Sequence, residues 1–170
     1  AKPSELNHWL LLGVVWERIF KLDKAFQLYA ALAKKPIVEL PSIPGLAQVK
    51  AIPHPSIPLV RMAGILRRLG ADDAAGRLLT EAVAIYDGDA SANLAFGKLL
   101  LDQNRASEAA KHFESALKFQ PIRTHPLAME AAVGLGIAQM AVGKTAGAIR
   151  SFTNAVSAVG GGDAGLDALT

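Results

Sequence analysis

Cysteine is absent from this sequence of 170 residues, so the chain has neither a disulfide framework nor a thiolate metal site. Aromatic residues are also scarce, at 6% of a chain that is 51% hydrophobic. Alanine, leucine, valine and isoleucine must therefore form most of the core, and their small or aliphatic side chains let helices approach closely. This composition is typical of a helical protein.

Long apolar runs and long runs of one charge are missing too. The apolar stretch at residues 9–16 is too short to cross a bilayer, and Glu17 and Arg18 follow it at once. The 18 basic and 15 acidic residues are interspersed and leave a net charge of +3, which does not indicate a nucleic-acid partner. The chain opens on Ala1 without a methionine, and we expect a processed protein or a domain cut from a longer one.

Similar residue types recur at fixed offsets around four alanines, which indicates a repeat protein. These alanines are Ala25, Ala75, Ala109 and Ala148, and the steps between them are 50, 34 and 39 residues. The shortest step is the period of a helix–turn–helix unit of about 34 residues, and the longer steps add insertions between units. The larger insertion, at residues 38–55, contains four prolines, which prevent a continuous helix there.

Within one copy the pattern predicts a helical hairpin. In the third copy we expect a first helix over residues 91–103, capped by Asp89 or Ser91. A second helix begins near Ser107 as its N-cap, buries a stripe that contains Phe113, and stops at Pro121. A single hairpin leaves apolar surface uncovered, so such units stack in arrays.

The four copies share one register. The third copy holds Leu94, Phe96, Gly97, Leu100, Ala109, Phe113, Ala116 and Pro121. The first holds Trp9, Leu12, Gly13, Trp16, Ala25, Tyr29 and Leu32, with Pro36 close to the place of the terminal proline. The second holds Leu59, Met62, Ala63, Leu66, Gly70, Ala75, Leu79 and Ala82, and the fourth holds Ala132, Leu135, Gly136, Gly143, Ala148, Phe152 and Ala155.

This register resembles the tetratricopeptide repeat, whose signature is W-x2-L-G-x2-Y, then A-x3-F-x2-A, then P. The resemblance implies an all-α fold, a right-handed superhelix of about four helical hairpins within residues 1–160. The repeats fall at about 6–37, 56–88, 90–123 and 129–160, with the Pro-rich insertion at 38–55 and a flexible or short capping tail at 161–170. Phe20 stands where the family has a turn glycine, so we expect a longer or bent helix junction in the first copy.

In this family the first helices of successive repeats line a concave groove that receives a peptide or a helix. The resemblance assigns these groove positions to Asn7, Leu10, Val14, Val60, Arg67, Arg68, Leu94, Lys98, Leu101, Val133, Ile137 and Met140. The known Lys and Asn clamp for a carboxy-terminal carboxylate is not expected here, because Leu10, Val14, Val60 and Gly64 occupy its places. We therefore expect an apolar ligand segment with a few acidic residues.

Two alternatives stay open for these positions. Leu94, Val133 and Ile137 either contact a ligand or pack between neighbouring helices. Arg67, Arg68 and Lys98 could pair with carboxylates of a partner, and for Arg67 and Arg68 the alternative is a solvated helix end.

Three functions follow from these observations. The first is a protein–protein interaction module, a bacterial scaffold or assembly factor that binds a protein or peptide partner and is not an enzyme. The second is a structural or oligomerising part of a larger membrane-associated complex, with membrane contact only through a segment outside this chain. Neither end of the array looks capped, so we expect self-association or a longer array. The cytoplasmic and periplasmic sides of a bacterial membrane both remain open as locations.

The third function, a nucleotide-binding enzyme, rests on one weak motif. Ala138 followed five and six residues later by Gly143 and Lys144, then Thr145, fits a relaxed phosphate-binding loop, but it starts inside an apolar helix instead of after a strand. The four histidines, His8, His54, His112 and His125, lack a second metal ligand at helical spacing. We expect no metal and no cofactor.

Overall fold

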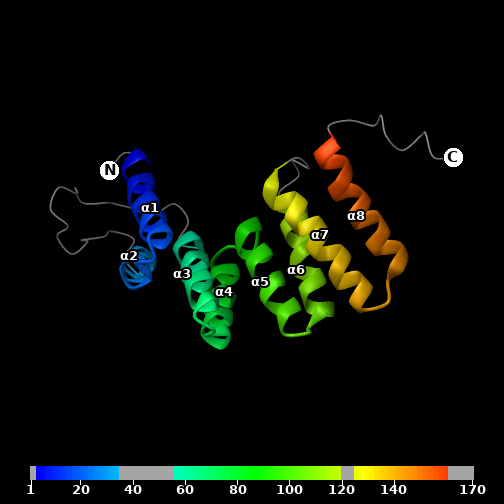
Figure 1. Ribbon diagram of the computed structural model, residues 1–170, viewed down its shortest axis with the longest axis horizontal. Coiled ribbons are helices and arrows are strands. Elements are labelled where there is room, and N and C mark those ends of the chain that lie inside the picture. The colour runs from blue at the N-terminus through cyan, green and yellow to red at the C-terminus, as the bar shows by residue number, and fades with distance from the viewer. Residues whose placement is uncertain (1–2, 35–55, 120–124, 161–170) are drawn as a thin grey trace. The chain divides into compact units, whose positions relative to one another are not determined.

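The computed structural model describes residues 3–34, 56–119 and 125–160, and all regular structure in these ranges is helical (Figure 1). The helices are α1 (Pro3–Arg18), α2 (Leu22–Lys34), α3 (Ser56–Arg68), α4 (Asp72–Ile85), α5 (Ala90–Asp102), α6 (Ala106–Phe119), α7 (Pro126–Ala141) and α8 (Thr145–Gly160). The expectation of an all-α fold made of helical hairpins is confirmed. The insertion at 38–55, the tail at 161–170, Pro36 and Pro121 lie outside the described residues.

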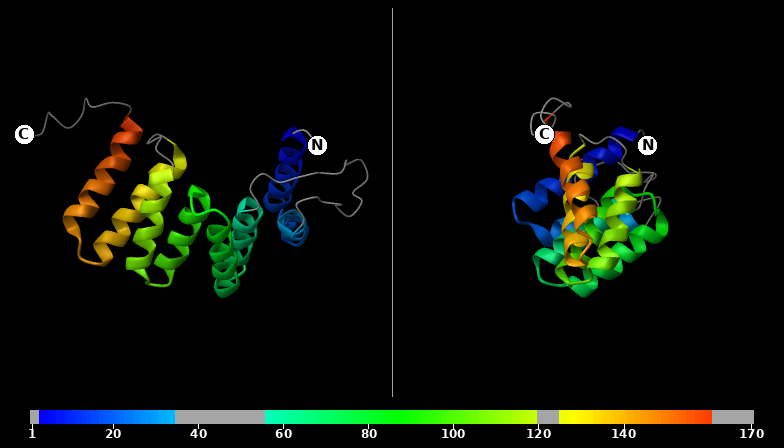
Figure 2. Two further views of the ribbon diagram at one scale, coloured as in Figure 1. Left: turned by 180° about the vertical axis from the view of Figure 1, so that it is seen from behind. Right: turned by 90° about the vertical axis from the view of Figure 1, so that its right-hand side faces the viewer.

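The chain divides into two compact units, Ala1–Tyr86 and Asp87–Thr170. In the first unit α1 packs on α2, α2 on α3, and α3 on α4. In the second unit α5 packs on α6 and α7, and α7 also packs on α6 and α8. Figure 2 shows the last pair, α7 in yellow and α8 in orange, lying alongside each other. Each unit therefore holds two hairpins in contact.

The core of the first unit joins residues from three helices. Its buried members are Trp9, Ala25, Leu28, Tyr29, Leu32, Met62 and Ile65. Gly13 of α1 makes room for Tyr29, because a β-carbon at Gly13 would lie 2.5 Å from the tyrosine ring. The small residue at this register thus lets the first helix of the hairpin approach the aromatic ring of the second.

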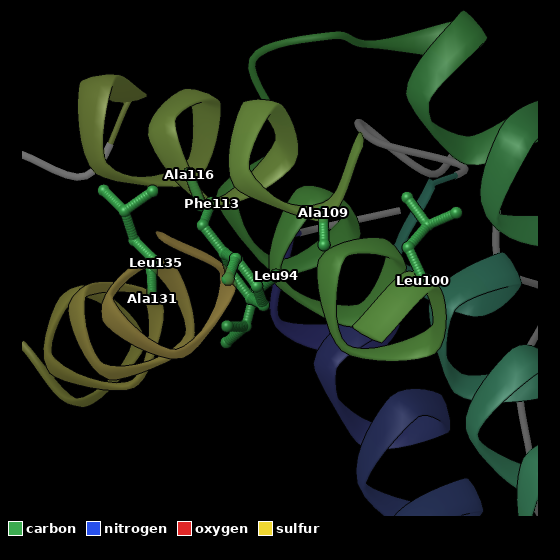
Figure 3. Close-up of a cluster of buried hydrophobic side chains, with 8 residues drawn as sticks. Leu94, Leu100, Ala109, Phe113, Ala116, Ala131 and Leu135 are labelled. Carbon is green, nitrogen blue, oxygen red and sulfur yellow. The ribbon is translucent and has the colours of Figure 1, made fainter. Parts of the chain in front are cut away.

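The core of the second unit is built around one aromatic ring. Phe113 of α6 is fully buried among residues of α5, α6 and α7, as Figure 3 shows. Its ring lies between two glycines: a β-carbon would be 2.8 Å from the ring at Gly97 and 2.5 Å from it at Gly134. The cluster is Leu94, Leu100, Ala109, Phe113, Ala116, Ala131, Leu135 and Ala138. The alanines and glycines of the repeat therefore set the spacing of these helices.

All four hairpins turn in the same way, over three residues each. The middle residue of each turn has a positive φ: Phe20 (58°), Gly70 (75°), Asn104 (60°) and Gly143 (76°). The next amide donates to a carbonyl five residues back in every case, as from Lys21 N to Trp16 O at 2.8 Å. This is the backbone pattern of a Schellman helix end.

The expectation of a longer or bent junction at Phe20 was therefore wrong. The α1–α2 turn spans residues 19–21, as many as in the other hairpins, because backbone hydrogen bonds and not the side chain fix its length. The expected N-cap at Ser107 was also wrong, since α6 already begins at Ala106. Asp89 does cap α5, accepting hydrogen bonds from the amides of Ser91 and Ala92.

The helices in the described ranges are not suited to cross a membrane. None of them combines enough residues with enough hydropathy to cross a bilayer.

Candidate functional site

An apolar stripe is uncovered on α7 of the second unit. Val133, Ile137 and Met140 follow one another at i, i+4 and i+7, which places them on one face of the helix. They expose 41%, 48% and 53% of their surface. The opposite face of α7 carries the alanines and glycines that pack in the core, so the stripe is the part of this helix that is left for contact with another molecule.

A pocket of about 700 Å³ adjoins this stripe. Ile137 and Leu101 contribute apolar wall, together with Ala141 and Val142 at the end of α7. The polar side of the pocket is formed by the start of α6 and the turn before it. The lining residues there are Asp102, Asn104, Arg105, Ala106, Ser107 and Glu108.

Arg105 and Glu108 form an ion pair on the polar side of this pocket. The guanidinium of Arg105 binds the carboxylate of Glu108 through two hydrogen bonds, Nε to Oε1 at 2.8 Å and Nη2 to Oε2 at 2.7 Å. This pairing holds the pKa of Glu108 below its usual range. Both charges are therefore already matched to each other, and the pocket offers a ligand an apolar wall beside a polar one.

The other groove positions of the second unit differ in what they offer. Leu94 exposes only 4% of its surface and packs against the Phe113 cluster, so it takes the packing alternative. Leu101 is half-buried and lines the pocket. Lys98 of α5 forms a salt bridge with Glu130 of α7. Its ammonium group is thus engaged within the unit.

The apolar groove positions of the first unit are less exposed than the stripe on α7. Leu10, Val14 and Val60 are half-buried, and Leu10 packs against the core. Asn7 lies in α1, but its side chain is outside the described part of the chain. Arg67 is half-buried and Arg68 is exposed at the end of α3.

A polar link joins α1, α2 and α3 beside these positions. The hydroxyl of Tyr29 donates to Glu17 Oε1 at 2.8 Å, and Arg61 Nη1 lies 3.9 Å from the same oxygen. Burial raises the pKa of Tyr29, and the Glu17 carboxylate raises it further, so the phenol stays protonated. Glu17 is therefore held in place inside the unit.

A second polar cluster was not expected from the sequence. Asn93 of α5 is buried and donates from Nδ2 to the carbonyls of Asp87 and Asp89, at 2.7 and 3.0 Å. Its Oδ1 lies 2.9 Å from Nδ1 of His112 on α6. Burial lowers the pKa of His112. The contact between His112 and Asn93 therefore links α6 to α5. The only hint of it in the sequence was that Asn93 stands where the first copy of the repeat has Trp9.

Comparison with known proteins identifies the repeat. Residues 94–163 match the family model of the tetratricopeptide repeat. The matched residues lie within the second unit. The sequence matches none of the curated proteins.

Solved structures share this fold at low sequence identity. A crystal structure of MamA matches with a TM-score of 0.66 at 16% identity, covering 93% of this chain and 80% of that chain. A second MamA structure gives 0.64 at 16% identity, over 93% and 75%. YrrB, described as a TPR protein with an unusual peptide-binding site, gives 0.60 at 16% identity, over 86% and 64%.

The phosphate-loop motif of the sequence ends in the α7–α8 turn. The amide of Gly143 donates to Met140 O and that of Lys144 to Gln139 O, at 3.0 and 2.8 Å. These amides are used by the turn and do not point at a phosphate site. Within the ranges that the structure describes, no group of three or more histidine, aspartate and glutamate side chains has the arrangement of a metal site.

Proposed function

We propose that the second unit binds an apolar segment of a partner protein over α5 and α7, and that the chain acts as a scaffold or assembly factor without enzymatic activity. The observation that carries this proposal is the uncovered stripe of Val133, Ile137 and Met140 beside the pocket. Three apolar side chains in one row suit a ligand that presents its own apolar residues at regular spacing, as an amphipathic helix or an extended peptide does.

Charge has a small part in the proposed binding. Of the three basic groove residues, Lys98 is paired with Glu130, and Arg68 lies over the ring of Phe20 at 5.7 Å from its centroid. Apolar burial therefore supplies most of the affinity in the proposed complex, and the ion pairs at the rim orient the ligand.

Substitution of the stripe tests the proposal. The variant Ile137→Asp/Met140→Asp places charges in the proposed contact, while Ile149→Asp/Val156→Asp on α8 is the matched control, because those residues are also exposed. Each chain is immobilised and used to capture proteins from the source organism. A captured partner is then purified and titrated against all three chains. We expect the stripe variant to bind it at least about tenfold more weakly, and the control to bind like the wild type.

The control variant on α8 shows whether a loss of binding is specific to the stripe. Equal loss of the partner in both variants would show that negative charge anywhere on the unit disturbs binding, and unchanged binding in the stripe variant would place the contact elsewhere. Either result overturns the proposal. Circular dichroism of each variant checks that the helices are intact.

A further inference from the structure

Three large apolar side chains are uncovered at the turns of the first unit, away from its core. Ile19 and Phe20 in the α1–α2 turn expose 52% and 78% of their surface, and Leu69 in the α3–α4 turn exposes 65%. Loop ends of soluble proteins are normally polar, so apolar side chains gathered at two turns mark a contact surface. We call Ile19, Phe20 and Leu69, with the basic residues named below, the turn surface.

The two turns lie next to each other. The guanidinium of Arg68, the last residue of α3, is 5.7 Å from the centroid of the Phe20 ring. This distance is within the range of a cation–π contact. The apolar residues of both turns thus belong to one surface.

Phe20 has an unfavourable backbone conformation for its size. Its φ of 58° lies in the left-handed region, where the equivalent turns of the chain have Gly70, Asn104 and Gly143. Glycine and asparagine tolerate this region, whereas a bulky side chain there is an outlier. Burial does not compensate the strain, because the ring is the most exposed of the three apolar side chains. Strained residues of this kind are retained where they serve a function.

Exposed basic residues flank both turns, and the exposed carboxylates of Asp23 and Asp73 lie nearby. Arg18, Lys21 and Arg68 are exposed and adjoin the apolar residues in sequence. The neighbouring carboxylates stand in the first turns of α2 and α4, where they compensate the positive ends of the helix dipoles; they are Asp23, Asp72 and Asp73. Aromatic and aliphatic side chains flanked by arginine and lysine match the chemistry of an anionic lipid surface.

We propose that the turn surface docks on an anionic membrane surface. Phe20, Ile19 and Leu69 enter the boundary between headgroups and acyl chains, and Arg18, Lys21 and Arg68 bind lipid phosphates. A lipid surface fits these side chains, because apolar and basic groups stand together at the exposed ends of the two turns. This contact uses a different unit from the partner-binding stripe on α7, and so it is independent of the proposed function.

Vesicle binding of the full chain tests this inference. We use vesicles of phosphatidylglycerol and phosphatidylcholine in equal parts, and vesicles of phosphatidylcholine alone, and measure the bound fraction by sedimentation. The wild type should bind the anionic vesicles at least about tenfold more strongly than the neutral ones. The variant Phe20→Asn should lose most of this binding while its turn is retained, because asparagine has the same conformation at position 104.

Two further variants keep the result interpretable. Leu69→Ser removes an apolar side chain without touching the strained residue, and should also weaken binding to anionic vesicles. Ile149→Asn changes an exposed apolar residue of the second unit outside the proposed stripe and should bind vesicles like the wild type. Thermal unfolding should show Phe20→Asn to be at least as stable as the wild type, since it removes the strain.

Several results would overturn the inference. They are a wild type that does not sediment with anionic vesicles, equal binding to both vesicle types, or unchanged binding in Phe20→Asn. A protein captured by the wild type and lost in Phe20→Asn, without any vesicle binding, would assign the turn surface to a protein partner and overturn the lipid proposal as well.

Discussion

At the scale of single residues, the ring of Phe113 shows how closely the repeat controls its helix spacing. Gly97 and Gly134 face the ring from two helices, so it has no space to move away from an added methyl group. Gly134→Ala should therefore lower the free energy of unfolding by about 1–3 kcal/mol, although alanine is the better helix former by about 1 kcal/mol. Urea unfolding measures the difference.

Gly64 provides the matched control for this prediction. It lies within α3, and a β-carbon there would have no atom within 4 Å. Gly64→Ala should raise stability by about 0.5–1 kcal/mol, because alanine loses less conformational entropy in a helix. If both substitutions shift stability in the same direction, close packing at Gly134 is not the cause.

His112 should make the stability of the protein depend on pH. Burial lowers its pKa in the folded state below the usual value of 6.5, and the charge of Glu108 opposes this only in part. Below about pH 6.5 the unfolded chain takes up a proton that the folded chain does not, so the free energy of unfolding falls. The contribution is complete above pH 6.5 and decreases as the pH falls toward the folded pKa.

The pH dependence is checked by urea unfolding between about pH 7 and pH 5. His112→Asn removes the titrating ring, and its amide nitrogen stands at the place of Nδ1, from which it can donate to Asn93 Oδ1. Its stability should fall less over this range than that of the wild type. Identical slopes in the two proteins would assign the pH dependence to other groups.

At the scale of elements, the sequence predicted the hairpins better than the details of their surfaces. The offsets of Ala109, Phe113 and Ala116 indicated a buried face on the second helix of the third copy, and all three are buried. Periodicity finds such faces because helical packing repeats with the chain. Periodicity does not predict how deeply a side chain is buried. Leu94 at a groove position is therefore buried, while Val133 at the matching position of the next copy is exposed.

Interactions between distant residues were out of reach of the sequence pattern. Lys98 and Glu130 are 32 residues apart, and their pairing depends on how α5 and α7 pack. The prediction of a longer or bent α1–α2 turn was wrong for a different reason. The missing glycine at Phe20 was visible, but the same backbone hydrogen bonds hold the turn in every copy, and the phenylalanine adopts the left-handed conformation they require.

At the scale of the whole molecule, the division into two units predicts that the second one folds alone. The first residues of this unit make hydrogen bonds within it: Asp89 caps α5, and Asn93 donates to the carbonyl of Asp87. Its core cluster comes from α5, α6 and α7 only. Two packed hairpins with a buried aromatic centre form a structure in which each hairpin covers apolar surface of the other.

The fragment of residues 87–170 should therefore show a helical circular dichroism spectrum and a cooperative thermal transition. Phe113→Ala in the same fragment is the control for a specific core, because truncating a buried phenylalanine costs about 3–5 kcal/mol, enough to abolish the transition of a small unit. A fragment that melts without cooperativity, or whose melting is the same with Phe113→Ala, would show that the second unit needs the rest of the chain to fold, since its own core would then not be what holds it together.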